Sequence, residues 1–481
     1  MKKRGLVQRL GLRIASGVLR PKPLAAALAL ATLAPATAAG QDQPWLADRR
    51  FTVGPGYRVG DYELHPGVAV EFGYDSNFFL RGSENDAPGD PVGAMRLRVT
   101  PSFSFSTLGP QRKGGGGTTQ ALPTAEFSGG LSLTYNEFFP VSGPAEGKER
   151  MWDQRNVSGL FDVRLNILPS RPWSGTISAS VGRLIQATQE GVVREDSVSE
   201  SYNRFTPTVG AELAWNPNGG LLDWRLGYNF AGTVFEVADF KGLTNIHHTF
   251  QTRGRWRFLP RSALLYDARI GIIHYLDADE KTGSTPLRVQ LGYNGLITKN
   301  FGALLMAGWG ASFYDPTAKE AAAGLPVQDF DSLIGQAEIR YFLTPNPSSD
   351  PQAASMTLSS VSLGFTRDFY DSYVGSFFER DRGYLKLTYF FGGRFVVIVD
   401  AGAGALVNPA INTTRITKNP WTDVRIDASG FAEYRFKDAF GINTTLRYNT
   451  RISDDWFDIP EGRDYLQWQQ FEAYLGARWL M

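Results

Sequence analysis

Long segments of this chain alternate apolar and polar side chains with a period of two, and this alternation constrains the fold more than any other feature. In residues 156–167, Val157 and Phe161 share one side, whereas Ser158 and Asp162 share the other. Successive side chains of a β-strand point to opposite faces, so each segment has one apolar and one polar face. Several segments keep this rhythm for about ten residues, close to the length of a tilted strand that crosses a bilayer.

The rhythm recurs about eighteen times after residue 64, and short turns alternate with longer polar connections, as in outer-membrane barrels. We therefore predict one all-β domain, a transmembrane antiparallel up-and-down β-barrel of about 18 strands over residues 65–481. The count depends on dividing residues 382–391 from 394–406 at Gly392 and Gly393. The alternative is a soluble β-sandwich, whose strands are usually shorter, at about five or six residues.

The first 38 residues have the composition of a secretory signal peptide. Residues 1–22 carry seven Lys and Arg and no acid, residues 24–33 are apolar, and Ala36-Thr37-Ala38 fits a cleavage site. Ten apolar residues are too few to span a bilayer, although an N-terminal membrane anchor is the alternative interpretation. We predict cleavage after Ala38, a short periplasmic segment over residues 39–64, and location in the outer membrane of a Gram-negative bacterium.

The chain lacks the residue patterns of most enzymes and metal proteins. It has no Cys, which excludes a disulfide framework and thiolate metal sites. It also has no nucleophile elbow, no H-E-x-x-H and no phosphate-binding loop. We therefore predict no catalytic residues, no metal, no cofactor and no nucleic-acid partner.

A barrel of eighteen strands is too wide for side chains to fill, so its polar faces should line an aqueous lumen. The strand phases place a set of charged residues there: Arg253, Arg255, Arg257, Arg288, Arg340, Arg425, Arg447, Asp162 and Glu338. One interpretation is a lumen that favours anionic or sugar-like solutes, with Arg253, Arg255 and Arg257 as a ladder for carboxylates or phosphates. The other is that arginines pair with acids across strands and stiffen the wall.

The first strand ends in Tyr74-Asp75-Ser76-Asn77. Together with the strand before it, this motif resembles the opening of the β-barrel porin 2 family, and the resemblance covers roughly residues 51–79. It implies a barrel linked to exopolysaccharide or capsule production, which serves as an outer-membrane exit for the polymer. From their position alone, Asp75 and Asn77 are also suited to capping the backbone of a turn.

These observations lead to one functional hypothesis and two alternatives. The leading hypothesis is an outer-membrane channel that passes exopolysaccharide or a similar hydrophilic polymer without catalysis. The alternatives are a general or solute-specific diffusion porin, and a structural or adhesive surface barrel with a closed lumen. The expected partners are outer-membrane lipid and lipopolysaccharide, the barrel-insertion machinery and a periplasmic polysaccharide export component.

Overall fold

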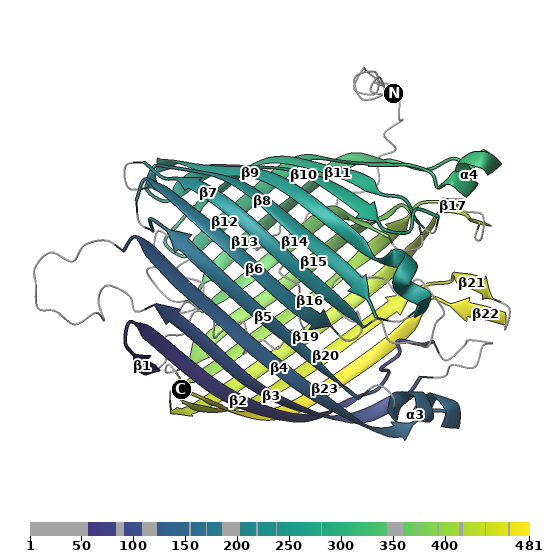
Figure 1. Cartoon of the computed structure of the whole chain (residues 1–481), viewed down its shortest axis with the longest axis horizontal. Coiled ribbons are helices and arrows are strands. Elements are labelled where there is room, and N and C mark those ends of the chain that lie inside the picture. Colours follow the sequence, from purple (N-terminus) through teal and green to yellow (C-terminus); the bar gives the residue numbers. More distant parts are fainter. Residues whose placement is uncertain are drawn as a thin grey trace, which may run out of the picture.

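The computed structural model shows a barrel of antiparallel strands (Figure 1). The polar faces of the strands point inward. It describes residues 56–82, 91–107, 123–152, 155–169, 171–184, 203–217, 220–236, 238–279, 281–343, 359–372, 375–391, 394–412, 417–437, 439–459 and 462–481. The predicted signal peptide and residues 39–55 of the predicted periplasmic segment lie outside these ranges.

Eighteen strands form the barrel wall. They are β2 (Tyr62–Asp75), β3 (Gly93–Thr107), β4 (Ala125–Ser142), β5 (Asn156–Ile167), β6 (Trp173–Leu184), β7 (Arg204–Trp215), β8 (Leu222–Phe235), β9 (Asn245–Leu259), β10 (Ser262–Tyr275), β11 (Ser284–Leu296), β12 (Phe301–Tyr314), β13 (Phe330–Phe342), β14 (Ser360–Asp371), β15 (Phe377–Phe391), β16 (Phe395–Asn408), β19 (Trp421–Lys437), β20 (Phe440–Ile452) and β23 (Trp468–Leu480).

Every strand pairs with its neighbours in chain order, and the last strand returns to the first. The closing pair joins β23 to β2 from Gly67 opposite Leu480 to Asp75 opposite Glu472. The predicted 18-stranded barrel is therefore confirmed, and the two segments divided at Gly392 and Gly393 are separate strands, β15 and β16. Closure matters because hydrocarbon offers no partners for the backbone of an open edge.

The two ends of the barrel differ, as Figure 1 shows. One end carries mostly short turns, the C-terminus and the small strand β1 (Tyr57–Val59), which pairs with the start of β2; the two long connections at this end are residues 108–124 and 343–359. The barrel thus begins at Tyr62, earlier than the predicted boundary at residue 65. The other end carries longer connections with α3 (Ala145–Trp152), η3 (Ala238–Leu243), α4 (Ala318–Ala323), β17 (Ile411–Asn412), β18 (Thr417–Lys418), β21 (Trp456–Ile459) and β22 (Gly462–Tyr465). Since periplasmic turns are short, the first end faces the periplasm.

The outer face of the barrel is apolar and exposed, as a lipid-facing surface must be. On β2 the outward Phe72 is 48% exposed, whereas the inward Glu71 is 2% exposed. The same contrast holds on the other strands, where Leu291 and Leu475 are 67% and 63% exposed. Among the described residues, no helix is both long and apolar enough to cross a membrane.

The strand phase can be tested with one pair of substitutions on β11. Leu291→Arg places a charge on the lipid face and should lower the free energy of unfolding by about 2–4 kcal/mol. Gln290→Arg places the same charge one residue away, where it points inward and stands opposite Asp267 of β10. Urea unfolding in lipid vesicles should show a large loss for the first variant and a small change for the second. Equal losses would contradict the assigned phase.

Candidate functional site

The lumen has one wall that is rich in hydroxyl groups. It is built by β4 to β7, whose inward positions hold mainly Ser, Thr and Asn. These side chains bond to one another across strands, as in Ser180 to Thr208 at 2.6 Å and Thr176 to Asn166 at 3.1 Å. This wall carries few charged groups, and it offers both donors and acceptors to a solute.

The remaining wall carries most of the charged residues predicted from the sequence, and most of them are ion-paired. The pairs are Arg253 with Glu212 at 2.7 Å, Arg255 with Asp223 at 3.7 Å, Arg288 with Asp368 at 2.9 Å, Arg340 with Glu338 at 2.9 Å and Arg447 with Glu472 at 3.6 Å. These contacts match the interpretation in which arginines stiffen the wall by pairing across strands. They do not test whether the same side chains also bind solutes.

Three predicted residues behave differently. Asp162 and Arg257 form no ion pair with any residue that the structure describes, and neither does Arg425. Arg257 continues the inward row of Arg253 and Arg255 on β9 towards the periplasmic end. The structure therefore brings this row together on one face, but acids of β7 and β8 neutralise its first two members.

The outer end of β14 and β15 leaves the wall and folds into the lumen. The ladder between β13 and β14 ends where Gly335 faces Arg367, whereas β14 and β15 stay paired as far as Asp371 and Phe377. Residues 368–371 and 377–380 thus form a hairpin that is attached to the sheet on one side only. We call these residues the inward hairpin.

The inward hairpin packs against the inner faces of β12 and β13. The ring of Phe369 stacks on Phe330 with centroids 4.1 Å apart, and Phe377 meets the same ring edge-on at 5.1 Å. The inward hairpin lies so close to β12 that the strand has a glycine, Gly310, at the point of contact. A Cβ on Gly310 of β12 would lie 2.7 Å from the Phe369 ring, so a side chain at this position would push the hairpin away.

Asp371 anchors the tip of the inward hairpin to strands on the far side of β12. Its two carboxylate oxygens accept hydrogen bonds from Tyr275 of β10 at 2.7 Å and Ser284 of β11 at 3.1 Å, and Lys281 lies 3.5 Å away. A residue of β14 reaches β10 only if it crosses the inner faces of β11, β12 and β13. The hairpin therefore narrows the lumen from inside the wall.

A chamber of about 860 Å³ lies beside the inward hairpin. It extends across the lumen from Asp267 and Arg288 to Arg447 and Asn449. Arg380 lines the chamber on the side of the inward hairpin. Its described lining contains six arginines (Arg269, Arg288, Arg367, Arg380, Arg382, Arg447) and four aspartates (Asp267, Asp368, Asp400, Asp427). Cavities of roughly 300–1,000 Å³ are typical of small-molecule sites, so the chamber has the size of one small solute.

The motif Tyr74-Asp75-Ser76-Asn77 builds the turn at which β2 leaves the sheet. Asp75 accepts from the backbone N–H of Asn77 at 3.0 Å and from the Gln470 amide at 3.0 Å. Asn77 donates to the carbonyl oxygen of Gln469 at 2.9 Å, and Ser76 accepts from the backbone of Phe471 at 2.8 Å. These contacts tie the first strand to the last one, and they engage the side chains of Asp75, Ser76 and Asn77 within the protein.

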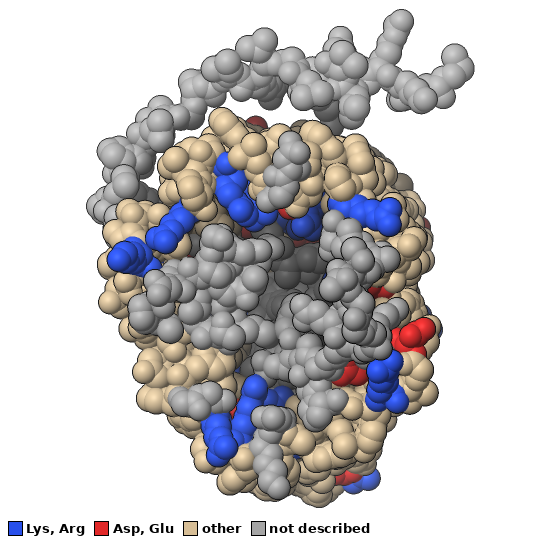
Figure 2. Space-filling model, turned by 90° about the vertical axis from the view of Figure 1, so that its left-hand side faces the viewer, with Lys and Arg blue, Asp and Glu red and all other residues tan. Residues whose placement is uncertain are grey.

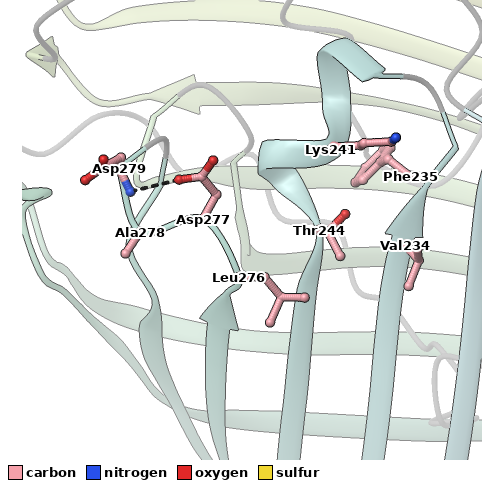
Figure 3. A pocket seen from close by; sticks show the side chains of 8 residues that line it. All are labelled: Val234, Phe235, Lys241, Thr244, Leu276, Asp277, Ala278 and Asp279. Atoms are coloured by element: carbon pink, nitrogen blue, oxygen red, sulfur yellow. Dashed lines mark hydrogen bonds between the residues drawn. The ribbon is translucent and has the colours of Figure 1, made fainter.

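Two other surfaces lie outside this chamber. A groove on the outer rim lies between η3 and the end of β10, where Val234 and Leu276 are exposed beside Lys241 and Asp277 (Figure 3). It faces the surroundings of the barrel. At the periplasmic end, Figure 2 shows Lys and Arg around the rim of a hollow, and the short turns there carry Arg171, Arg261, Lys299 and Arg394. The described residues contain no group of His, Asp and Glu that could hold a metal ion.

Comparisons with known proteins find similarity only at the level of architecture. No family model and no curated protein matches the sequence. Solved structures that match include a BenF-like porin from Pseudomonas fluorescens Pf-5 (10% identity, 88% of this chain and 100% of that one, TM-score 0.40) and OccAB4 from Acinetobacter baumannii (9%, 87% and 98%, TM-score 0.43). Another is Pseudomonas aeruginosa OccK2 (OpdF) in complex with glucuronate (13%, 89% and 99%, TM-score 0.42).

The protein is an outer-membrane β-barrel. Its closed wall, apolar belt and polar lumen are the features that define such barrels in Gram-negative bacteria. The likeness to the solved porins is too distant to carry an argument about the solute. The function must therefore be argued from the lumen itself.

The anchor of the inward hairpin gives a direct test of the constriction. Asp371→Ala removes acceptors for Tyr275 and Ser284, and hydrogen bonds to a charged group contribute about 1.5–3 kcal/mol each. The released population of the hairpin should rise by about tenfold or more, since 1.4 kcal/mol corresponds to a factor of ten. Single-channel recordings should show larger and noisier conductance than in the wild type.

The control for this test is Asp331→Ala. Asp331 accepts a hydrogen bond from Trp309 at 2.6 Å on the outer face of the barrel, away from the hairpin anchor. Its loss should leave the conductance unchanged. If Asp371→Ala also leaves the conductance unchanged, the hairpin does not limit the flow.

Proposed function

We propose that this chain is a passive diffusion channel of the outer membrane for small hydrophilic solutes, and that it performs no catalysis. The observation that carries the proposal is the inward hairpin, which reduces the wide lumen to a chamber of about 860 Å³. A space of this size suits one small solute. A charged and hydroxyl-lined wall replaces part of the hydration shell of such a solute during passage.

The structure favours this solute channel over the polymer exit expected from the resemblance. That expectation rests on Tyr74, Asp75, Ser76 and Asn77, and the polar atoms of this motif form a turn and bind the last strand. A polymer moving through the barrel would have to pass the inward hairpin along its whole length. A link to exopolysaccharide production, with a periplasmic export component as partner, stays a prediction of the resemblance alone.

The contacts of the lumen also distinguish the channel from a purely structural barrel. A closed lumen would leave no space for a solute, whereas the described chamber has a volume of about 860 Å³ and is lined mainly by charged and amide side chains. We expect the barrel-insertion machinery to act on the C-terminal strand β23, as for other outer-membrane barrels, with lipid and lipopolysaccharide around the belt.

Solute flux into proteoliposomes tests the proposed function. The purified barrel should admit monosaccharides and small organic acids and exclude long oligosaccharides, because the inward hairpin limits the opening. Asp371→Ala should shift the size limit upward. Flux is measured by the rate of vesicle swelling in isosmotic solutes.

A genetic experiment separates the alternatives. Deletion of the gene should reduce uptake of small solutes and leave the mass of secreted polysaccharide unchanged. Loss of the polysaccharide would instead support the polymer exit. A purified barrel that passes neither ions nor solutes would support the structural or adhesive role.

A further inference from the structure

The lumen face repeats a short motif in which an acidic residue is followed two positions later by arginine. Side chains two residues apart on a strand share a face, so the acid and the guanidinium lie side by side. In four cases the arginine binds this acid: Asp223 with Arg225 (2.9 Å), Asp267 with Arg269 (2.6 Å), Glu338 with Arg340 (2.9 Å) and Glu433 with Arg435 (2.6 Å). The charge of each arginine is thereby matched on its own strand.

Arg425 on β19 breaks this pattern, because the acids on both sides of it are engaged elsewhere. Asp423 accepts from Arg451 Nε at 3.0 Å. The same carboxylate oxygen also accepts from Trp421 at 3.1 Å and from Asn408 at 3.3 Å. On the other side, Asp427 is bound by Arg380 at 3.2 Å and by Arg382 at 3.1 Å.

The guanidinium of Arg425 is therefore left without an anion. The side chain is only 5% exposed, and its Nε is buried with no hydrogen-bond acceptor. The face of Trp468 lies 5.9 Å from Arg425 Cζ and offers a weak attraction, but no oxygen. In contrast, the exposed Arg164, which follows Asp162 on β5 without pairing to it, is solvated by the lumen.

Several side chains that can donate hydrogen bonds but cannot accept them lie around Arg425. The strand register sets Arg382, Gly404, Arg425, Arg451 and Trp468 in one row across β15, β16, β19, β20 and β23. Guanidinium and indole groups only donate, and the indole N–H of Trp468 is also buried without a partner. A group that completes these bonds must be rich in acceptor oxygens.

The charged side chains around Arg425 also favour an anionic ligand. Arg380, Arg382 and Lys386 pair with Asp400 or Asp427, and Arg451 pairs with Asp423, whereas Arg425 pairs with none of these three carboxylates. Burying an unpaired charge is costly, and an anion that pairs with it offsets this cost. Arg382 lines the chamber together with Arg380, Asp400 and Asp427, and it begins the row that continues to Arg425 and Trp468, which are not part of the described lining.

We propose that Arg425 and Trp468 anchor the anionic group, a carboxylate or a phosphate, of a solute that enters this row from the chamber past Arg382. The planar guanidinium fork suits both groups. The inference rests on the proposed diffusion function and names the class of solute that it selects. The rival arrangement is that Arg425 turns to Asp423 Oδ1, a buried acceptor of this cluster that has no hydrogen bond.

The test compares Arg425→Met and Trp468→Phe with the wild type in binding succinate and inorganic phosphate, measured by calorimetry on the detergent-solubilised barrel. Loss of a charge-assisted hydrogen bond should weaken anion binding by about tenfold or more for Arg425→Met, and less for Trp468→Phe. In planar bilayers, the anion-to-cation permeability ratio should fall in Arg425→Met. Binding of succinate alone or of phosphate alone assigns the group, and either result supports the site.

Arg435→Met is the matched control, since it lies on the same strand and its partner Glu433 also holds Arg478. It should keep wild-type anion affinity. Because replacing an unpaired buried charge by an apolar side chain is neutral or stabilising, Arg425→Met should unfold at the same or a higher urea concentration. Unchanged anion affinity in Arg425→Met overturns the inference, and so does a marked loss of stability, which would show that Arg425 pairs with Asp423.

The two proposals fail in different ways. A wild-type barrel that passes neutral sugars but binds neither anion refutes the anion site and leaves the diffusion channel intact. A barrel that binds succinate through Arg425 but passes no solute refutes the diffusion channel.

Discussion

The structure depends on the fact that hydrocarbon offers no hydrogen-bond partners to a backbone. A sheet placed in a bilayer must therefore have no free edge, and this chain meets the requirement by pairing β23 with β2. Once the ring is closed, each side chain has one of two environments. The apolar positions meet lipid, and most polar positions are directed to the inside.

The closed ring places many charged groups on the inside, and their arrangement follows from strand geometry. An acid and an arginine two residues apart on one strand are neighbours, as are residues directly opposite each other on adjacent strands. Pairs such as Asp267 with Arg269 and Glu71 with Arg98 use these two relations. The wall is thus stabilised by short contacts within the plane of the sheet, and the inward hairpin adds the main contacts across it.

The sequence predicted the wall well because period-two alternation is a local property of each strand. It placed Arg253, Arg288 and Arg425 on the lumen side, and the structure has them there. The partners of these residues were not predictable, because Arg288 on β11 meets Asp368 on β14 across two intervening strands, β12 and β13. The inward hairpin was missed for the same reason. Phe369 alternates like any strand residue, and only the contact of Asp371 with Tyr275 on β10 shows that the strand has left the wall.

The seam between the two ends of the chain has a consequence for biogenesis. The Asx turn at Asp75 is completed by Gln470, a residue 395 positions later in the chain. The N-terminal turn is therefore left half-bonded until the final strand arrives, and contacts of such long sequence separation form late in folding. The seam thus distinguishes a finished ring from an incomplete one: a chain that stops before β23 exposes Asp75, Asn77 and the whole free edge of β2. Quality-control proteases of the envelope would meet these unsatisfied groups only on unfinished molecules.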